Sequence, residues 1–448
     1  MRRLAAFLVL LPLLLLFSGA PRALSGGRDA PRLDKKAIHD LARRFFAARP
    51  PTKFVPWDAA RREALLKEAR ALGPIPEGSL ATVRDLLWKA VKKHAPRVKG
   101  EIDTPYGKAT WIQNGRGGKK QGLLVGLHGG GEGAGNAGEA AGNWNLPKCL
   151  AMYPQGIRLV HDTWNTVHGE AFVLTLIEIA KMRYEVDPDR VYVAGFSMGG
   201  TGSWHMAGRH PDLLAGAIPS HGVLMASPKS QVQTKEEVEA IQPGLIPNVR
   251  NLAVYFSTGT IDRNCRPGTF LYAWDEIQQL RKDDPGGYQD VRFKIWPGLA
   301  HAFGPGEPSR GLKWIATKRR NAFPEKLVWE YASDPYPLPT AQDEIGRLPK
   351  RYFYWLQCQR PADGMMVTCT RKGNEFDLSV TIAFPEDFSI LLNPAMIDVK
   401  KDVVVRVDGK EVWRGRPQPT FATVLETLDA RVDRTLVFDR KVEIPEGE

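Results

Sequence analysis

The glycine-flanked serine in Gly195-Phe196-Ser197-Met198-Gly199 constrains the fold of this chain more than any other feature. It follows directly on an apolar run, residues 190–196, which predicts a buried strand, and it opens a helical pattern over 199–209. A serine at a sharp turn from a strand into a helix is typical of a nucleophile elbow, and glycines let such a turn close tightly. We therefore expect Ser197 to stand at the edge of a sheet with its hydroxyl exposed.

Strand-like apolar runs alternate with helical patterns through the middle of the chain. Continuous apolar runs indicate strands that are buried on both faces, and their alternation with helices predicts an α/β domain with a doubly wound, mostly parallel sheet over residues 101–321. The strands are expected at 101–106, 108–113, 122–128, 149–153, 190–196, 215–219, 252–257 and 291–296, and the helices at 170–184, 199–209 and 268–282.

Two regions of different character flank this domain. Residues 26–100 carry apolar side chains at helical spacing, which predicts a small helical region. Residues 322–448 carry short alternating runs, with an Asp408-Gly409 turn between two of them, which predicts a small β-rich domain containing a hairpin. A helix is expected within it from Thr420 to Leu428.

The first residues resemble an export signal. Arg2 and Arg3 precede an apolar run from Leu4 to Phe17, and small residues follow. The run is about 14 residues long, whereas a membrane-spanning helix needs about 20. We expect a signal peptide over residues 1–25, a secreted or periplasmic protein, and no transmembrane segment elsewhere in the chain.

The net charge of +12 belongs mostly to one segment, because residues 28–100 contain 18 Lys or Arg against 8 Asp or Glu. Such a segment could contact an anionic surface, or it could be a helical cover with a solvated basic face. No nucleic-acid-binding motif accompanies the charge, so no nucleic-acid partner is expected.

A serine nucleophile needs a base and a group that orients the base. Asp262 follows the expected strand 252–257, and His301 follows the expected strand 291–296. The order Ser, Asp, His along the chain agrees with a triad at the carboxyl edge of one parallel sheet. Asp275 and Asp290 are weaker candidates for the acid.

The tetrahedral intermediate also needs donors for its oxyanion. His128-Gly129-Gly130-Gly131 follows another apolar strand, and glycines let a backbone approach a substrate closely. We expect backbone N–H groups of Met198 and of Gly129 or Gly130 to serve as donors. A flexible loop or a phosphate cradle is the alternative, but the glycine spacing of nucleotide-binding loops is absent.

Other residues carry less certain signals. His221 and Trp164 are candidate substrate-binding residues, and Trp144 could stack on a sugar near the same site. No cluster of His, Cys and carboxylates has metal-ligand spacing, so neither a metal nor a cofactor is expected. Cys358 and Cys369 could bridge a hairpin, or the four cysteines, which also include Cys149 and Cys265, could be buried free thiols.

A longer motif resembles a known group. The run from Asp187 through Val193 into the Gly195–Gly200 turn, with His128-Gly129-Gly130-Gly131, is similar to secreted esterases of the α/β-hydrolase fold. These are the polyhydroxybutyrate-depolymerase-like and the feruloyl or acetylxylan esterase-like enzymes, to which the prolyl-oligopeptidase-like hydrolases are related. The resemblance covers roughly residues 120–315. It implies an α/β-hydrolase with Ser197 as nucleophile, His301 as base and Asp262 as acid, and with Met198 and Gly129 or Gly130 as oxyanion donors.

Together these features predict an exported serine carboxylic-ester hydrolase that acts through an acyl-enzyme. Its substrate would be a small-molecule or polymer ester, such as a polysaccharide-linked ester or a polyester. The basic helical N-terminus and the β-rich C-terminus do not belong to the family pattern and leave the substrate open. A serine peptidase of the prolyl-oligopeptidase-like type and an inactive surface- or carbohydrate-binding protein are the alternatives.

Overall fold

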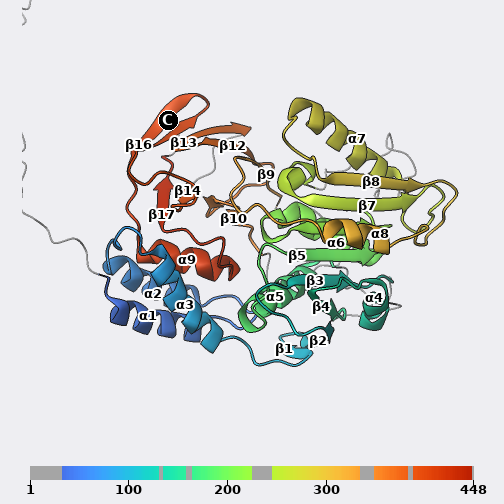
Figure 1. Ribbon diagram of the computed structural model, residues 1–448, viewed down its shortest axis with the longest axis horizontal. Coiled ribbons are helices and arrows are strands. Elements are labelled where there is room, and N and C mark those ends of the chain that lie inside the picture. The colour runs from blue at the N-terminus through green and yellow to red at the C-terminus, as the bar shows by residue number, and fades with distance from the viewer. Residues whose placement is uncertain are drawn as a thin grey trace, which may run out of the picture.

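The computed structural model consists of a central α/β domain, three N-terminal helices and a C-terminal β-rich part (Figure 1). It describes residues 33–130, 135–157, 164–224, 245–332, 348–381 and 387–445. The expected signal over residues 1–25 lies outside these ranges. Among the described residues, no helix combines the length and the apolar character that crossing a membrane requires.

The central sheet has eight strands in the order β1-β2-β4-β3-β5-β6-β7-β8. The six strands from β4 to β8 in this order run parallel, β2 pairs antiparallel with β4, and β1 pairs antiparallel with β2. This confirms the predicted mostly parallel sheet. The strands are β1 (Glu101–Thr104), β2 (Gly107–Asn114), β3 (Gly122–Leu127), β4 (Cys149–Pro154), β5 (Val191–Phe196), β6 (Gly216–Ser220), β7 (Ala253–Gly259) and β8 (Val291–Trp296).

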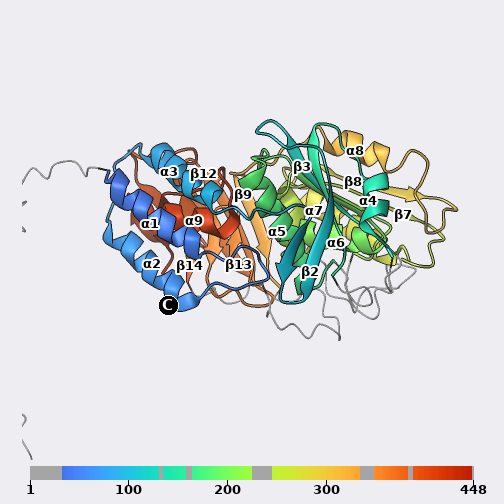
Figure 2. The ribbon, with the colours of Figure 1, turned by 90° about the horizontal axis from the view of Figure 1, so that it is seen from below.

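Helices cover both faces of this sheet, which explains why its inner strands are apolar throughout. Leu124 and Tyr192 belong to the buried cluster on the side of α4 and α8, while their neighbours Leu123 and Val191 belong to the cluster on the side of α5, α6 and α7 (Figure 2). The helices are α4 (Ala137–Asn143), α5 (Val167–Arg183), α6 (Met198–Arg209), α7 (Gly268–Asp283) and α8 (Ser309–Ile315). Both α4 and α8 are absent from the prediction, because seven residues are too few for a clear helical period.

The C-terminal part contains two sheets and one helix. One sheet has the order β10-β11-β14-β17, and the other has the order β16-β15-β13-β12-β9. The strands are β9 (Lys326–Glu330), β10 (Tyr352–Phe353), β11 (Leu356–Cys358), β12 (Met366–Lys372), β13 (Glu375–Thr381), β14 (Phe388–Leu392), β15 (Val403–Val407), β16 (Lys410–Gly415) and β17 (Arg440–Glu443), and the helix is α9 (Phe421–Arg431).

The Asp408-Gly409 hairpin is present between β15 and β16, with Val407 opposite Lys410. Both turn residues have positive φ, 48° and 82°, as the favoured two-residue hairpin turn requires. Of the two alternatives for the cysteines, the structure shows buried free thiols and no bridge between Cys358 and Cys369. Cys358 lies in β11 and Cys369 in β12, which belong to different sheets, and all four cysteines are buried free thiols.

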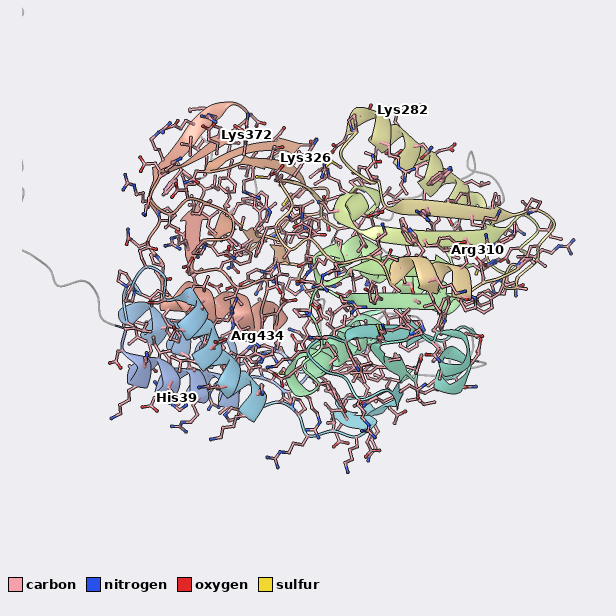
Figure 3. The ribbon with its side chains drawn as sticks, viewed as in Figure 1. His39, Lys282, Arg310, Lys326, Lys372 and Arg434 are labelled. Atoms are coloured by element: carbon pink, nitrogen blue, oxygen red, sulfur yellow. The ribbon has the colours of Figure 1, made fainter. Side chains whose placement is uncertain are left out.

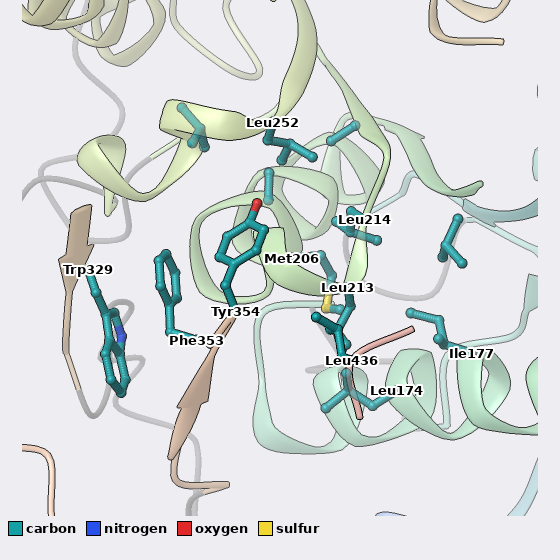
Figure 4. Close-up of a cluster of buried hydrophobic side chains, with 14 of the residues drawn as sticks. Leu174, Ile177, Met206, Leu213, Leu214, Leu252, Trp329, Phe353, Tyr354 and Leu436 are labelled. Carbon is teal, nitrogen blue, oxygen red and sulfur yellow. The ribbon is translucent and has the colours of Figure 1, made fainter. Parts of the chain in front are cut away.

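The C-terminal part shares a hydrophobic core with the α/β domain. Trp329, Phe353 and Tyr354 belong to the same buried cluster as Leu213 and Leu214 of the domain (Figure 4). The Tyr354 hydroxyl also donates a hydrogen bond to the carbonyl of Pro211, at 3.2 Å. The β-rich part is therefore packed against the domain as a continuation of its interior.

The N-terminal helices α1 (Lys35–Ala48), α2 (Ala59–Ala71) and α3 (Leu80–Lys93) form a second core with α9. Ion pairs join this region to the rest of the protein, in both directions of charge. Arg49 contacts Glu178 of α5 and Asp429 of α9, both at 2.9 Å. Arg434, labelled in Figure 3, pairs with Asp85 of α3 at 2.9 Å.

Candidate active site

Three side chains from three strand ends meet at the carboxyl edge of the central sheet. Ser197 follows β5, Asp262 follows β7 and His301 follows β8. In open α/β sheets, sites form at this edge because successive parallel strands deliver their following loops to the same place.

Ser197 occupies a strained turn between the last residue of β5 and the first of α6. Its backbone has φ 58° and ψ −122°, which a residue with a side chain rarely adopts. Its N–H donates to the carbonyl of Ser220 in β6, at 2.9 Å. A Cβ at Gly195 would collide with the backbone of Gly199, and one at Gly200 with the carbonyl of Ser220. The glycines of the motif are therefore required by close backbone approach.

The three side chains form a continuous hydrogen-bonded chain. His301 Nε2 lies 2.9 Å from Ser197 Oγ, and His301 Nδ1 lies 2.8 Å from Asp262 Oδ2. Asp275 lies within α7, and Asp290 forms an ion pair with Lys318, so Asp262 is the carboxylate in contact with the histidine.

Four donors surround the buried Asp262 carboxylate. Its Oδ1 accepts from the backbone N–H groups of Asn264 and Cys265, at 2.9 and 2.8 Å, and its Oδ2 is within hydrogen-bond distance of His301 and His221. Burial alone would raise the pKa of the Asp262 carboxyl, but the hydrogen bonds from His221, His301 and the Cys265 amide hold it well below its ordinary value. Asp262 is therefore an ionised acceptor.

This ionisation state determines the tautomer of His301. A carboxylate can only accept, so the proton of the neutral imidazole must lie on Nδ1. The lone pair of Nε2 then faces the Ser197 hydroxyl, which donates to it. The arrangement is competent to remove a proton from Ser197.

The glycine loop after β3 lies against the elbow. A Cβ on Gly129 would lie 3.3 Å from Ser197 Cβ and 3.1 Å from the Phe196 carbonyl. Gly130 has φ 82°, and Met198 is the first residue of α6. These positions put the backbone of the expected oxyanion donors next to the serine. Gly131 lies outside the described residues.

His221 does not face the substrate side of the site, as was expected, but lies buried next to Asp262. It follows β6 and is 0% exposed, and its Nδ1 lies 3.1 Å from Asp262 Oδ2. With no exposed surface, its ring cannot contact a substrate in this conformation. The expectation is corrected, because the turn directs the ring into the protein, behind the acid.

Comparison with known proteins agrees with this geometry. Residues 152–331, which contain all three side chains, match the dienelactone hydrolase family. The chain carries a dienelactone hydrolase family domain. Together with the order of the central sheet, this match gives the chain an α/β-hydrolase fold. No curated protein matches the chain.

Solved structures similar to this hydrolase include three esterases. A thermostable esterase is 20% identical, with 49% of this chain and 62% of that chain covered and a TM-score of 0.34. An acetyl xylan esterase from Paenibacillus sp. R4 is 15% identical, with 54% and 95% covered and a TM-score of 0.36. A hyperthermophilic esterase from the archaeon Pyrobaculum calidifontis is 17% identical, with 58% and 97% covered and a TM-score of 0.35. The hydrolase spans less than two thirds of the length of the first of these.

The tryptophans expected near the substrate are interior residues of the hydrolase. Trp164 is 2% exposed and donates its indole N–H to the His128 carbonyl at 3.0 Å, while Trp144 is 1% exposed and packs edge-on against Phe303. This corrects the expectation that Trp164 binds substrate and that Trp144 offers a stacking surface. Trp164 instead holds the strand end that leads into the glycine loop.

Cys265 is a residue of the hydrolase site that the sequence did not indicate. Its backbone N–H donates to Asp262 Oδ1 at 2.8 Å, and its thiol is close enough to Ser197 for that side chain to affect the pKa of the thiol. Burial and the neighbouring Asp262 carboxylate raise the pKa of the thiol to about 12, so it is protonated at neutral pH. The sequence offered one sign of this role, the position of Cys265 three residues after Asp262. The geometry of the turn between the two cannot be predicted from the sequence, so the contact could not be either.

His221, Asp262 and His301 are the one group of three metal-ligating side chains among the described residues. Their ligand atoms are already in hydrogen-bond contact through Asp262 Oδ2. An ion there would have to displace both Nδ1 protons, so the arrangement fits a proton-transfer chain better than a metal centre.

Proposed function

We propose that this hydrolase is an exported serine esterase that works through an acyl-enzyme, with Ser197 as nucleophile, His301 as base and Asp262 as orienting acid. The observation that carries the proposal is the chain of contacts from Asp262 through His301 to Ser197, at 2.8 and 2.9 Å. A hydroxyl is a weak nucleophile at neutral pH, and this chain supplies the base and the fixed tautomer that activate it.

In the first half-reaction, Ser197 Oγ attacks the ester carbonyl while its proton passes to His301 Nε2. The negative charge on the former carbonyl oxygen is held by the N–H groups of Met198 and of Gly129 or Gly130. When the carbon–oxygen bond of the ester breaks, the leaving alcohol takes the proton from His301, and the acyl group stays on Ser197.

Water completes the cycle by the reverse sequence. His301 removes a proton from a water molecule as the water attacks the acyl-enzyme, and the proton then returns to Ser197 Oγ as the acid leaves. Asp262 stays ionised throughout and stabilises the imidazolium that forms in each half-reaction.

The alternatives draw less support from the molecule. A prolyl-oligopeptidase-like peptidase carries a large N-terminal propeller, whereas the described residues before β1 form three helices. The alternative of a carbohydrate-binding protein with an inactive core relied on Trp144 and Trp164 as stacking surfaces, and both are buried. The substrate class we favour is a polysaccharide-linked ester or a polyester, and export by a signal over residues 1–25 remains part of the proposal.

The test combines active-site labelling with turnover. Wild type should react with a fluorophosphonate probe and hydrolyse p-nitrophenyl acetate, and Ser197→Ala should lose labelling and lower kcat by about 10⁴- to 10⁶-fold. Ser309→Ala, at the exposed start of α8, is the matched serine control and should behave as wild type. Hydrolysis by Ser197→Ala at the wild-type rate would overturn the assignment.

A panel of substrates then tests the class. Acetylated xylan, feruloyl esters and polyhydroxybutyrate should be compared with peptide p-nitroanilides, with Ser197→Ala as the blank for each. Preferred cleavage of the peptide amides would replace the esterase proposal with the peptidase. Turnover of none of the polymers would overturn the polymer-ester assignment and leave a small-molecule ester.

A further inference from the structure

Two histidines converge on one carboxylate oxygen in this site. His301 Nδ1 lies 2.8 Å from Asp262 Oδ2, and His221 Nδ1 lies 3.1 Å from the same atom. Since the ionised carboxylate can only accept, each ring must carry its proton on Nδ1. The proton relay proposed above requires only His301, so His221 calls for an explanation of its own.

The backbone holds His221 firmly in this orientation. Its φ is 48°, in the left-handed region, and its N–H donates to the Ser257 carbonyl of β7 at 2.8 Å. A Cβ on the next residue, Gly222, would collide with the backbone N–H of Thr201 and lie 2.9 Å from the Ser197 carbonyl. The loop after β6 is thus wedged between the elbow and β7, and the ring cannot turn away by a small adjustment.

The surroundings of Nε2, on the side of the His221 ring away from Asp262, show that packing alone does not account for a histidine here. His221 Nε2 is buried and has no hydrogen-bond partner within the described part of the chain. The ring lies beside Phe196, with ring centroids 5.3 Å apart. Burying an unpaired nitrogen is unfavourable, and an apolar side chain would avoid that cost. What the histidine adds is its Nδ1 donor.

We propose that His221 is a positioning residue that acts through Asp262, by fixing the carboxylate so that its Oδ2 is directed at His301 Nδ1. The inference rests on the function proposed above. The Asn264 and Cys265 amides hold Oδ1, and the two histidines hold Oδ2, so the carboxylate has donors on both oxygens and cannot rotate. A fixed acid keeps His301 in the orientation and tautomer that proton transfer needs.

The test uses three substitutions that a positive φ tolerates. Asn and Gly adopt the left-handed region more readily than other residues, and so does Asp. His221→Asn places an amide N–H near the position of Nδ1 and keeps the donor. His221→Gly removes the donor, and His221→Asp matches Asn in size but presents a carboxylate to Asp262.

The experiment measures kcat and KM for p-nitrophenyl acetate separately, to show which of the two each substitution changes. Thermal unfolding of each variant is measured alongside. We expect His221→Gly to lower kcat about 10- to 100-fold with KM within about threefold, as for other groups that orient a catalytic residue. His221→Asn should recover most of kcat, and His221→Asp should be at least as impaired as Gly. If His221→Gly does not fold, the Asn and Asp pair decides the question by itself.

Two outcomes would overturn the inference. One is kcat of the donor-free variants within about twofold of wild type, and the other is an equal loss in Asn and in the donor-free variants, which a purely structural role predicts. Failure of the proposed function is separate, because it would appear as fluorophosphonate labelling and turnover that survive in Ser197→Ala.

Discussion

Lys181 of α5 and Asp433, just beyond α9, form an ion pair of 2.7 Å in which both side chains are buried. Arg320 contacts the same carboxylate at 2.9 Å. One carboxylate from the C-terminal part thus pairs with two cations of the α/β domain in the interior, and Arg320 also pairs with Asp189. The contact shows that the C-terminal part is a structural component of the hydrolase.

Removing the Asp433 charge should destabilise the protein strongly. In Asp433→Asn, Lys181 would remain buried without its counter-ion and Arg320 would keep only its ion pair with Asp189. Breaking a buried pair in this way costs about 3–5 kcal/mol. Urea unfolding at pH 7 measures the change in the free energy of unfolding. Asp398→Asn is the control, since Asp398 pairs with Lys401 on the surface at 3.7 Å and should change it by less than about 0.5 kcal/mol. Equal effects of the two substitutions would contradict the role of the buried pair.

The C-terminal part should also be indispensable for folding. Truncation after residue 321 would remove Trp329, Tyr354 and Trp355, each at most 1% exposed, and would open the core they share with Leu213 and Leu214. The exposed apolar surface predicts an insoluble or unfolded product. Soluble yield and far-UV circular dichroism of residues 26–321 check this. A soluble fragment with the kcat of the full chain would show that the hydrolase folds alone.

The sequence predicted the central sheet well, and it placed Ser197, Asp262 and His301 at the strand ends where the structure brings them into contact, because both depend on local signals joined by a simple topological rule. Their catalytic roles stay a prediction. Ser197 is defined by its own turn, and Asp262 and His301 are defined by the ends of apolar strands. Predicting the directions of side chains failed, because the end of a strand fixes where a residue lies but not which way its side chain points. His221 and Ser197 both follow parallel strands and both have positive φ, yet one ring is buried behind the acid and one hydroxyl faces the histidine.

The sequence pattern also could not predict which strands of the C-terminal part pair with one another. Cys358 and Cys369 are separated by a short turn-like segment, which favours a hairpin, but the chain crosses from one sheet to the other between them. Strand β14 (Phe388–Leu392) is buried along its whole length, so it lacks the alternation that predicted strands within residues 322–448.

Packing around the elbow predicts that alanine at Gly199 is not tolerated. Its Cβ would collide with the Leu127 carbonyl at the end of β3, and relief would displace the Gly129 loop that faces Ser197. We expect Gly199→Ala to lower kcat for p-nitrophenyl acetate by about 10²-fold or more, as loss of an oxyanion donor does. Gly142→Ala is the matched control, because nothing lies within 4 Å of its Cβ and it sits in α4 with negative φ. That change should be neutral or stabilising by up to about 1 kcal/mol. Equal kcat in both variants would refute the packing argument.

Glu330, at the end of β9, should make the protein less stable as the pH rises. Burial and the nearby Glu276 charge raise the pKa of its carboxyl from 4.5 to about 7. The folded state therefore binds the proton more tightly than the unfolded state, and stability falls as the pH rises from about 4.5 to about 7. Glu330→Gln cannot ionise and should escape this loss, with a gain over wild type of up to about 3 kcal/mol at pH 8 that declines toward zero at pH 4. Urea unfolding of both proteins at pH 4, 6 and 8 measures the difference. A gain that does not vary with pH would mean that the carboxyl ionises alike in the folded and unfolded states.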